Sequence, residues 1–477
     1  MRFCFKICIL FALVTNSISL KAQNCRCADN FNFVVDRIKK NYPGYHDKVN
    51  TNNKIKFDKF TDSLLKKAFL AKPYQCAPIL RSWLSFFKDN HIGISYNDGK
   101  YTDSEIRNYY DAEEKTTWSE PLFISYLKGH ESLDSLEGIW NNYAGTYQIG
   151  IVKDKASKND FIGFIIKPDG IRWSKQQVKL RIEKKGSMYS LKYFRASDHS
   201  INPLSFSKIK DTLSFGTGLS AKWYKNDVTI TQVTASQNKE SAPQFTALDD
   251  KTCLFTMPSF ASLDYVSAMN DLLKENSDRL QRCEHLIIDL RNNSGGSVLV
   301  YKKLLPYIYT NPILTEGANV LATQDNIQDY YSQIPNNIPD SMKRIFEKNL
   351  NTLKLHVGTL YPLYPIDTIT LPKVFNNPKS VSLIVNRNTS SAAELFIMEA
   401  KQSSKVKVYG TNSSGTIDYL EVVKANIPCG FYNLNYPAAR SLRLPDHPMD
   451  NIGIKPDILI PQQTGDWIEF VKTYKDK

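Results

Sequence analysis

Outside its N-terminal residues, the 477-residue chain has no apolar stretch close to the roughly 18 residues that a membrane helix needs. It also has no Cys-x-x-Cys pair and no His-x-x-His cluster, the spacings that hold zinc. It contains no internal repeat and no low-complexity segment. These absences argue against a membrane-spanning protein, a zinc protein and a repeat array, and we expect neither a metal nor a cofactor.

The positive charge of the chain does not form the pattern of a nucleic-acid-binding protein. The formal net charge is +13, but the lysines are scattered among acidic residues. No basic helix and no platform of aromatic side chains stands out, although both are typical of nucleic-acid recognition. We therefore expect a solvated surface and no nucleic-acid partner.

The N-terminus has the pattern of a secretory signal peptide. Arg2 and Lys6 precede a short apolar run over 7–14, and Leu20 and Ala22 occupy the −3 and −1 positions of a cleavage site. The sequence predicts that residues 1–22 are removed. The mature protein is then expected to be periplasmic or secreted, without stable membrane insertion.

Six of the eight cysteines follow the predicted signal peptide, an even number that suits an oxidising compartment. Either Cys25 or Cys27 could pair with Cys76, and the sequence leaves this choice open. Cys253 and Cys283 flank apolar segments and are expected to be packed thiols rather than nucleophiles.

Changes in residue periodicity divide the mature chain into three predicted domains. Apolar residues recur at helical spacing in 23–130, which predicts a helical N-terminal domain. Short alternating runs fill 131–247 and predict an antiparallel β-barrel or sandwich insert. The run Gly138-Ile139-Trp140 is similar to the start of lipocalin-like barrels, although a tryptophan that only closes a barrel floor is the plainer interpretation. Strands and helices alternate over 248–477, which predicts an α/β domain with a largely parallel sheet.

Ser391 is the strongest candidate for a nucleophile. It follows the predicted strand over 381–385 and opens an apolar helix, so free N–H groups and the positive end of the helix dipole would face a developing oxyanion. Ser391 and Glu394 also have the spacing of a capping box, in which a serine only satisfies backbone donors. Taken alone, the motif favours this capping role, because caps far outnumber nucleophiles.

A second strand-to-helix turn has the composition of an oxyanion hole. Gly295 and Gly296 follow the apolar strand over 285–290, and paired glycines expose backbone N–H groups without side-chain obstruction. The turn is neither a P-loop nor a Gly-x-Gly-x-x-Gly motif. A simple turn also needs glycine, so this motif by itself identifies no chemistry.

Together, these motifs resemble the catalytic domain of the C-terminal processing and tricorn-type serine peptidases, which have a ClpP/crotonase-like core. The resemblance rests on Asp-Leu-Arg-Asn-Asn-Ser-Gly-Gly-Ser at 289–297 and Thr-Ser-Ser-Ala-Ala-Glu at 389–394, and it extends to 409–415 and 453–457. Four ordered motifs are harder to reach by chance than one. The resemblance implies that Ser391 is the nucleophile, that the N–H groups of Gly295 and Ala392 are oxyanion donors, and that Gly296 shapes the turn.

The resemblance favours the tricorn-type branch for the catalytic base. The processing branch places a lysine 25 residues after the serine, where this chain has Thr416. The tricorn-type branch uses a histidine from the preceding helical region and a late carboxylate. This implies His91 as general base and Asp450, where that branch has a glutamate, as the acid that orients the imidazole.

Three other residues compete for these roles. Asp450 is one methylene shorter than the family's glutamate, so Glu394 and Asp446 remain candidates for the acid. His447 is the competing base. His91 itself could be only a hydrogen-bonded histidine at a helix-to-strand junction.

The sequence therefore predicts an exported serine peptidase that acts on a peptide or protein substrate through an acyl-enzyme on Ser391. The processing peptidases carry a PDZ module, and here the β segment over 140–230 stands in its place. Three alternatives stay open: an inactive homologue that binds peptide or a hydrophobic ligand, a small-substrate esterase or amidase, and a surface interaction module. The sequence predicts neither the cleavage preference nor the oligomeric state.

Overall fold

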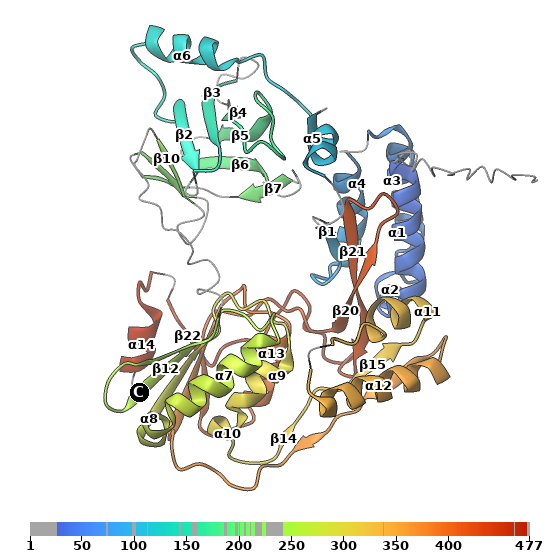
Figure 1. Ribbon diagram of the computed structural model, residues 1–477, viewed down its shortest axis with the longest axis vertical. Helices are drawn as coiled ribbons and strands as arrows, with labels where there is room; N and C mark the ends of the chain where they lie inside the picture. The colour runs from blue at the N-terminus through green and yellow to red at the C-terminus, as the bar shows by residue number, and fades with distance from the viewer. Residues whose placement is uncertain are drawn as a thin grey trace, which may run out of the picture.

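The described part of the chain forms four β-sheets, of six, nine, five and two strands (Figure 1). The computed structural model describes residues 26–72, 75–97, 102–111, 113–142, 145–154, 160–185, 188–195, 199, 201–204, 207–209, 211–214, 222–225, 242–336, 338–461 and 463–474. The predicted signal peptide over 1–22 lies outside these residues. The expected combination of α/β structure with antiparallel sheets is confirmed. Among the described helices, none combines the length and the apolar character needed to cross a bilayer.

The six-stranded sheet contains the two strands that lead into the candidate catalytic turns. Its strands, in spatial order, are β11 (Gln244–Ala247), β12 (Thr252–Thr256), β13 (His285–Asp289), β18 (Ser380–Val385), β19 (Val406–Gly410) and β22 (Ile458–Leu459). The pairings from β12 to β22 are parallel, as the sequence predicts, whereas β11 pairs antiparallel with β12. Because β13 and β18 are parallel neighbours, their carboxyl ends meet at the same edge of the sheet.

Helices cover both faces of this sheet, which explains why its strands are apolar on both sides (Figure 1). One face packs against the helices that precede and follow β13 and β18, and the other packs against the C-terminal helix. The helices of this part are α7 (Asp264–Glu275), α8 (Ser277–Arg282), α9 (Val298–Tyr301), the 3-10 turn η4 (Lys302–Leu304), α10 (Leu305–Ile308), α13 (Ala392–Ala400) and α14 (Trp467–Thr473).

A five-stranded sheet joins the N-terminal helices to the C-terminal half of the chain. Its strands are β1 (Gly93–Tyr96), β15 (Ala318–Leu321), β16 (Leu360–Tyr364), β20 (Tyr419–Asn426) and β21 (Tyr432–Ser441), with β21 paired to β1, β15 and β20. The N-terminal helices are α1 (Cys27–Asn41), α2 (Tyr45–Lys48), α3 (Lys54–Leu70), α4 (Cys76–Leu84) and the 3-10 turn η2 (Ser85–Phe87). The segment between β15 and β16 adds α11 (Gln324–Asn326), the π-helix η5 (Ile327–Tyr331) and α12 (Asp340–Leu355).

The N-terminal helices do not have a hydrophobic core of their own. Phe31 of α1 and Trp83 of α4 belong to the same buried cluster as Leu434 and Tyr436 of β21. The apolar faces of these helices are therefore covered by a sheet whose strands come mostly from beyond residue 317. The segment that contains His91 is held against the catalytic half by this shared core. The predicted domain boundary at residue 130 stays a prediction.

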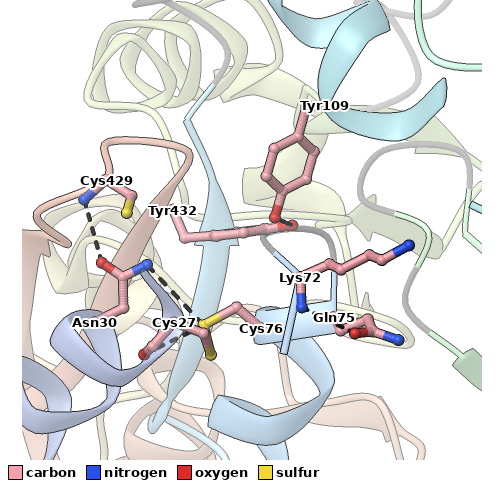
Figure 2. The surroundings of a disulfide bond; sticks show 8 residues. All are labelled: Cys27, Asn30, Lys72, Gln75, Cys76, Tyr109, Cys429 and Tyr432. Atoms are coloured by element: carbon pink, nitrogen blue, oxygen red, sulfur yellow. Dashed lines mark hydrogen bonds between the residues drawn. A yellow bond between two sulfur atoms is a disulfide. The ribbon is translucent and has the colours of Figure 1, made fainter. Parts of the chain in front are cut away.

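A disulfide joins the first residues of two N-terminal helices. Cys27 of α1 is bonded to Cys76 of α4, which is one of the two pairings that the sequence left open (Figure 2). Cys429, between β20 and β21, is also disulfide-bonded, and its N–H donates to Asn30 Oδ1 at 3.2 Å (Figure 2). Cys253 and Cys283 are free and buried, as expected of packed thiols.

In Figure 1 the nine-stranded sheet and α6 (Glu120–Gly129) lie apart from the other sheets, and α5 (Asp103–Asp111) lies between them and the N-terminal helices. All the strand pairs described in this sheet are antiparallel. Trp140 is fully buried in its core. Its strands are β2 (Gly138–Asn142), β3 (Gln148–Lys153), β4 (Asp160–Lys167), β5 (Val178–Lys185), β6 (Met188–Phe194), β7 (Ile201–Leu204), β8 (Ser207–Ile209), β9 (Thr212–Ser214) and β10 (Lys222–Lys225); β14 (Ile313–Leu314) and β17 (Thr368–Ile369) form the two-stranded sheet.

Candidate active site

Ser391 stands at a strained turn between β18 and α13. Its backbone has φ 56° and ψ −125°, a region that non-glycine residues rarely occupy. Such strain persists only where neighbouring contacts hold it. One of these contacts comes from the preceding residue, because Ser390 N–H donates to the carbonyl of Asn293 at 2.9 Å and so ties the turn to the glycine turn after β13.

Glu394, fully buried on the first turn of α13, holds the Ser391 turn from the other side. One carboxylate oxygen accepts the N–H groups of Ser391 at 3.0 Å and Thr416 at 2.8 Å. The other accepts the hydroxyl of Ser413 at 2.5 Å and the N–H of Gly415 at 2.7 Å. Glu394 is therefore the glutamate of the expected capping box, and it also cross-links the nucleophile turn to the segment over 413–416. It makes no hydrogen bond to the ring of His91 in the described structure, so it is not the orienting acid.

His91 lies within hydrogen-bonding distance of Ser391. The residue precedes β1, and its own N–H donates to Asp89 Oδ1 at 2.9 Å. Its Nε2 is 3.1 Å from Ser391 Oγ, and its Nδ1 is 2.7 Å from the carbonyl oxygen of Tyr419. The structure thus brings together two side chains that are 300 positions apart in the chain.

The partners of the His91 ring determine its tautomer. A carbonyl oxygen carries no proton, so Nδ1–H donates to Tyr419 and Nε2 is left as an acceptor. The hydroxyl of Ser391 therefore donates to Nε2. Burial lowers the pKa of His91 below 6.5, against the opposing effects of the Tyr419 hydrogen bond and of the charges on Asp450 and Glu394. The ring is held neutral, in the tautomer that can take a proton from the serine.

Asp450 does not make the hydrogen bond to His91 that the resemblance implies. One of its oxygens accepts the N–H groups of Ile417 at 3.2 Å and Asp418 at 3.0 Å. The other is 3.9 Å from Lys48 Nζ and makes no hydrogen bond within the described chain. Burial raises the pKa of Asp450 to about 7. The predicted contact between Asp450 and the His91 ring is wrong, because a backbone carbonyl already occupies Nδ1.

The carboxylate instead holds the backbone that presents that carbonyl. Asp450 binds the N–H of Asp418, and the Asp418 carboxylate accepts the N–H groups of Met449 and Asp450, both at 2.9 Å. The two segments are thereby cross-linked in both directions. Tyr419, whose carbonyl contacts His91, follows directly after the cross-link.

The remaining candidates lie away from the Ser391 hydroxyl. Asp446 and His447 are exposed on the surface. Neither contacts Ser391 or His91 in the part of the chain that the structure describes, and the backbone of His447 is paired with Arg443. His447 is therefore a suitable control for His91.

The glycine turn lies against the nucleophile but differs from the expected oxyanion hole in one donor. Gly295 N–H donates to the side chain of Asn293 at 2.8 Å, so it is not free to bind an oxyanion. The backbone N–H groups of Gly296 and Ala392 donate to no acceptor among the described residues. Ala392 keeps its predicted role as a candidate donor, and Gly296 becomes the second candidate in place of Gly295.

Gly295 also leaves no room for a side chain. A Cβ at this position would lie 2.7 Å from Ser391 Cβ and 2.9 Å from the backbone nitrogen of Ala392. We expect Gly295→Ala to displace the nucleophile turn and to reduce reaction of Ser391 with a fluorophosphonate by at least about 100-fold. Gly358→Ala is the matched control, because Gly358 has the same φ of 89° and a Cβ at this position would have no other atom within 4 Å. Equal labelling rates in the two variants would contradict this reading of the turn.

Several groups of this site could not be found from residue types. The Tyr419 carbonyl is a backbone group, which no residue type identifies. Asn293 accepts the N–H groups of Gly295 and Ser390, but it belongs to a motif in which the glycines gave the signal for an oxyanion hole. Asp89, which accepts the N–H of His91, was also not singled out from the sequence, although an aspartate two positions before a residue often accepts that residue's backbone N–H. Among the described residues, no group of three or more His, Cys, Asp or Glu side chains is arranged to hold a metal ion.

Comparison with known proteins relates the part of the chain that contains Ser391 to one family. Residues 251–460 match the sequence model of Peptidase family S41. A protein of Chlamydia trachomatis serovar D is 22% identical over 211 residues, and a protein of Chlamydia muridarum is 22% identical over 214 residues. These matches cover 38% and 39% of this chain and only 35% and 36% of the relatives' own lengths.

Several solved structures match most of the chain, at low identity and with TM-scores below 0.5. Mature CPAF is 13% identical, with a TM-score of 0.48 and coverage of 91% of this chain and 92% of that one. The photosystem II D1 C-terminal processing protease is 13% identical, with a TM-score of 0.38 and coverage of 91% and 93%. The tricorn protease is 10% identical, with a TM-score of 0.37 and coverage of 91% and 34%. Residues 251–460 of this chain, which include Ser391, are therefore similar in sequence to Peptidase family S41, and this match supports a serine-type peptidase.

Proposed function

We propose that this protein hydrolyses peptide bonds in a peptide or protein substrate, with Ser391 as nucleophile and His91 as general base. The observation that carries the proposal is the 3.1 Å contact between His91 Nε2 and Ser391 Oγ, in a ring whose other nitrogen is committed to a carbonyl. The match of residues 251–460 to Peptidase family S41 supports the same reaction class. A neutral imidazole at this distance can take the serine proton as Oγ attacks the substrate carbonyl.

The steps follow from the donors and acceptors around Ser391. As Oγ attacks, the proton moves to Nε2 and the imidazolium keeps its Nδ1–H bond to Tyr419. The N–H groups of Ala392 and Gly296 would receive the negative charge on the substrate oxygen. Nε2–H then protonates the leaving amine, and water repeats the sequence on the acyl-enzyme.

Asp450 has an indirect part in this proposal. The ring is oriented by the Tyr419 carbonyl, and Asp450 orients the segment that precedes it through two backbone N–H groups. Its charge also raises the pKa of His91, so it stabilises the imidazolium that forms during the reaction. Asp450 is a positioning residue in this scheme.

We also assign the finer architecture and the cellular location as proposals. The parallel strand order of β12, β13, β18 and β19 supports a ClpP/crotonase-like domain over 248–477. The antiparallel nine-stranded sheet with its buried Trp140 supports a barrel-like domain over 131–247. The Cys27–Cys76 disulfide supports a periplasmic or secreted protein, because disulfides persist in oxidising compartments.

Two assays on the full chain test the proposed reaction. A fluorescent fluorophosphonate is expected to attach once per chain, and mass spectrometry of the digested product should place it on Ser391. A reduced and alkylated protein substrate should be cleaved by the unlabelled protein only. Hydrolysis of small esters without any cleavage of unfolded protein would favour the esterase alternative. Absence of both labelling and cleavage would leave the inactive binding protein.

The pH dependence of labelling reports the state of His91. Labelling requires the neutral ring, so its rate falls as pH drops through the pKa of His91. Because burial lowers this pKa, we expect the midpoint of the acid limb to lie below pH 6.5, measured from initial labelling rates between pH 4 and 8. The variant His447→Gln should keep the same midpoint. A midpoint above 6.5 would contradict a base that is held neutral by burial.

A further inference from the structure

A cavity of about 590 Å³ lies between α2, α3 and the turn η2. Its apolar lining comes from the rings of Phe60, Phe86 and Phe87. Phe60 and Phe86 are stacked, with ring centroids 6.3 Å apart, and Phe86 meets Phe87 edge-on at 5.9 Å. The volume falls in the range of small-molecule sites, and the flat faces of the rings suit an aromatic or aliphatic body.

Three lysines line the same cavity: Lys48, Lys56 and Lys88. Within the described chain, Lys56 and Lys88 form no ion pair, and the nearest acidic oxygen to Lys48 is 3.9 Å away on Asp450. Lys56 and Lys88 are exposed beside the apolar lining, and their positive charge would complement an anionic ligand held there.

The acidic residue in the lining, Asp47, is already paired with other groups and does not neutralise Lys56 and Lys88. The Asp47 carboxylate accepts Arg440 Nε at 2.7 Å and the hydroxyl of Tyr419 at 2.8 Å. Asn53 is also engaged, since its amide donates to the carbonyl of Lys48 at 2.8 Å. Among the described lining residues, the ammonium groups of Lys56 and Lys88 are therefore the charged groups left to meet a ligand.

We propose that this cavity binds an organic carboxylate, with an aromatic or aliphatic body against Phe60, Phe86 and Phe87 and its carboxylate beside Lys56 and Lys88. A carboxylate carries one charge and is easier to remove from water than a doubly charged phosphate, which matters against an apolar lining. The site is separate from the Ser391 hydroxyl, and the Lys48–Asp450 pair connects it to the segment that orients His91. The proposal does not depend on peptidase activity.

Three probes separate the contributions of charge and apolar body. Ligand-observed NMR titration of the full chain at low salt is expected to show binding of 3-phenylpropanoate with a Kd on the order of 1 mM. Its neutral analogue 3-phenylpropanamide and the bodiless anion acetate should bind at least about tenfold more weakly. Equal binding of the acid and the amide would overturn carboxylate recognition, and equal binding of acetate would overturn the role of the rings.

Paired variants locate the site. The double variant Lys56→Gln/Lys88→Gln should weaken 3-phenylpropanoate binding by about fivefold, as expected for the loss of two partly exposed ion pairs. The control Lys59→Gln/Lys66→Gln removes the same charge from exposed positions of α3 outside the cavity lining. Both pairs lie on the surface, so all variants should stay folded. No binding of the acid up to about 10 mM, or equal loss in both double variants, would overturn the proposal.

Discussion

Replacing Ser391 by alanine is expected to reduce cleavage of an unfolded protein substrate by a factor of about 10⁴ to 10⁶. The change removes the oxygen that would form the acyl-enzyme and leaves the backbone donors in place. His91→Gln should cause a loss of similar size, because glutamine cannot take the proton that His91 Nε2 accepts from the hydroxyl 3.1 Å away. The measurement is kcat/KM on one labelled protein substrate.

The double variant is the decisive comparison. If Ser391 and His91 act as one unit, Ser391→Ala/His91→Gln should be no slower than either single variant, since each change alone already stops proton transfer. His447→Gln, at the exposed competing base, should retain activity within about twofold. Full activity in His91→Gln together with a large loss in His447→Gln would transfer the role of base to His447.

Glu394→Gln is expected to be the most damaging conservative substitution in the structure. The carboxylate accepts four hydrogen bonds, from Ser391, Ser413, Gly415 and Thr416, and is completely buried. Glutamine has one acceptor oxygen, and its amide would face at least one backbone N–H that it cannot satisfy. We expect a loss of about 3 kcal/mol in the free energy of unfolding, measured by denaturant titration.

The same substitution should also affect Ser391. The Glu394 bond to the Ser391 N–H helps to hold a backbone at φ 56°, so residual folded protein should label more slowly with a fluorophosphonate. Glu399→Gln is the matched control on the same helix. Glu399 is also buried, but it accepts one hydrogen bond, from Tyr301, and burial raises its pKa toward the neutral form that glutamine mimics. An equal loss in the free energy of unfolding in the two variants would show that the four hydrogen bonds of Glu394 stabilise the fold no more than the single bond of Glu399.

The difference between expected and observed acid at the site has a physical cause. The family pattern placed a carboxylate near position 450, and Asp450 is indeed buried in the electrostatic range of His91. Its side chain binds the backbone at 417 and 418, however, and a carbonyl of the next residue contacts the ring. Every residue type has a carbonyl, so no sequence pattern identifies one that orients a histidine.

Local chemistry in the sequence determined the elements that carry the site. The apolar strand before Ser391, the Ser391–Glu394 spacing and the glycines at 295 and 296 depend on periodicity, capping and backbone freedom, which act over a few residues. The tertiary structure alone decided which distant groups meet: the core that the N-terminal helices share with β21, the position of His91 beside Ser391, the Tyr419 carbonyl at Nδ1, and the loss of the Gly295 N–H to Asn293. These outcomes depend on packing and hydrogen bonds between segments up to three hundred residues apart. Which groups meet there is determined by their distance in the folded structure, and spacing along the chain does not contain this information.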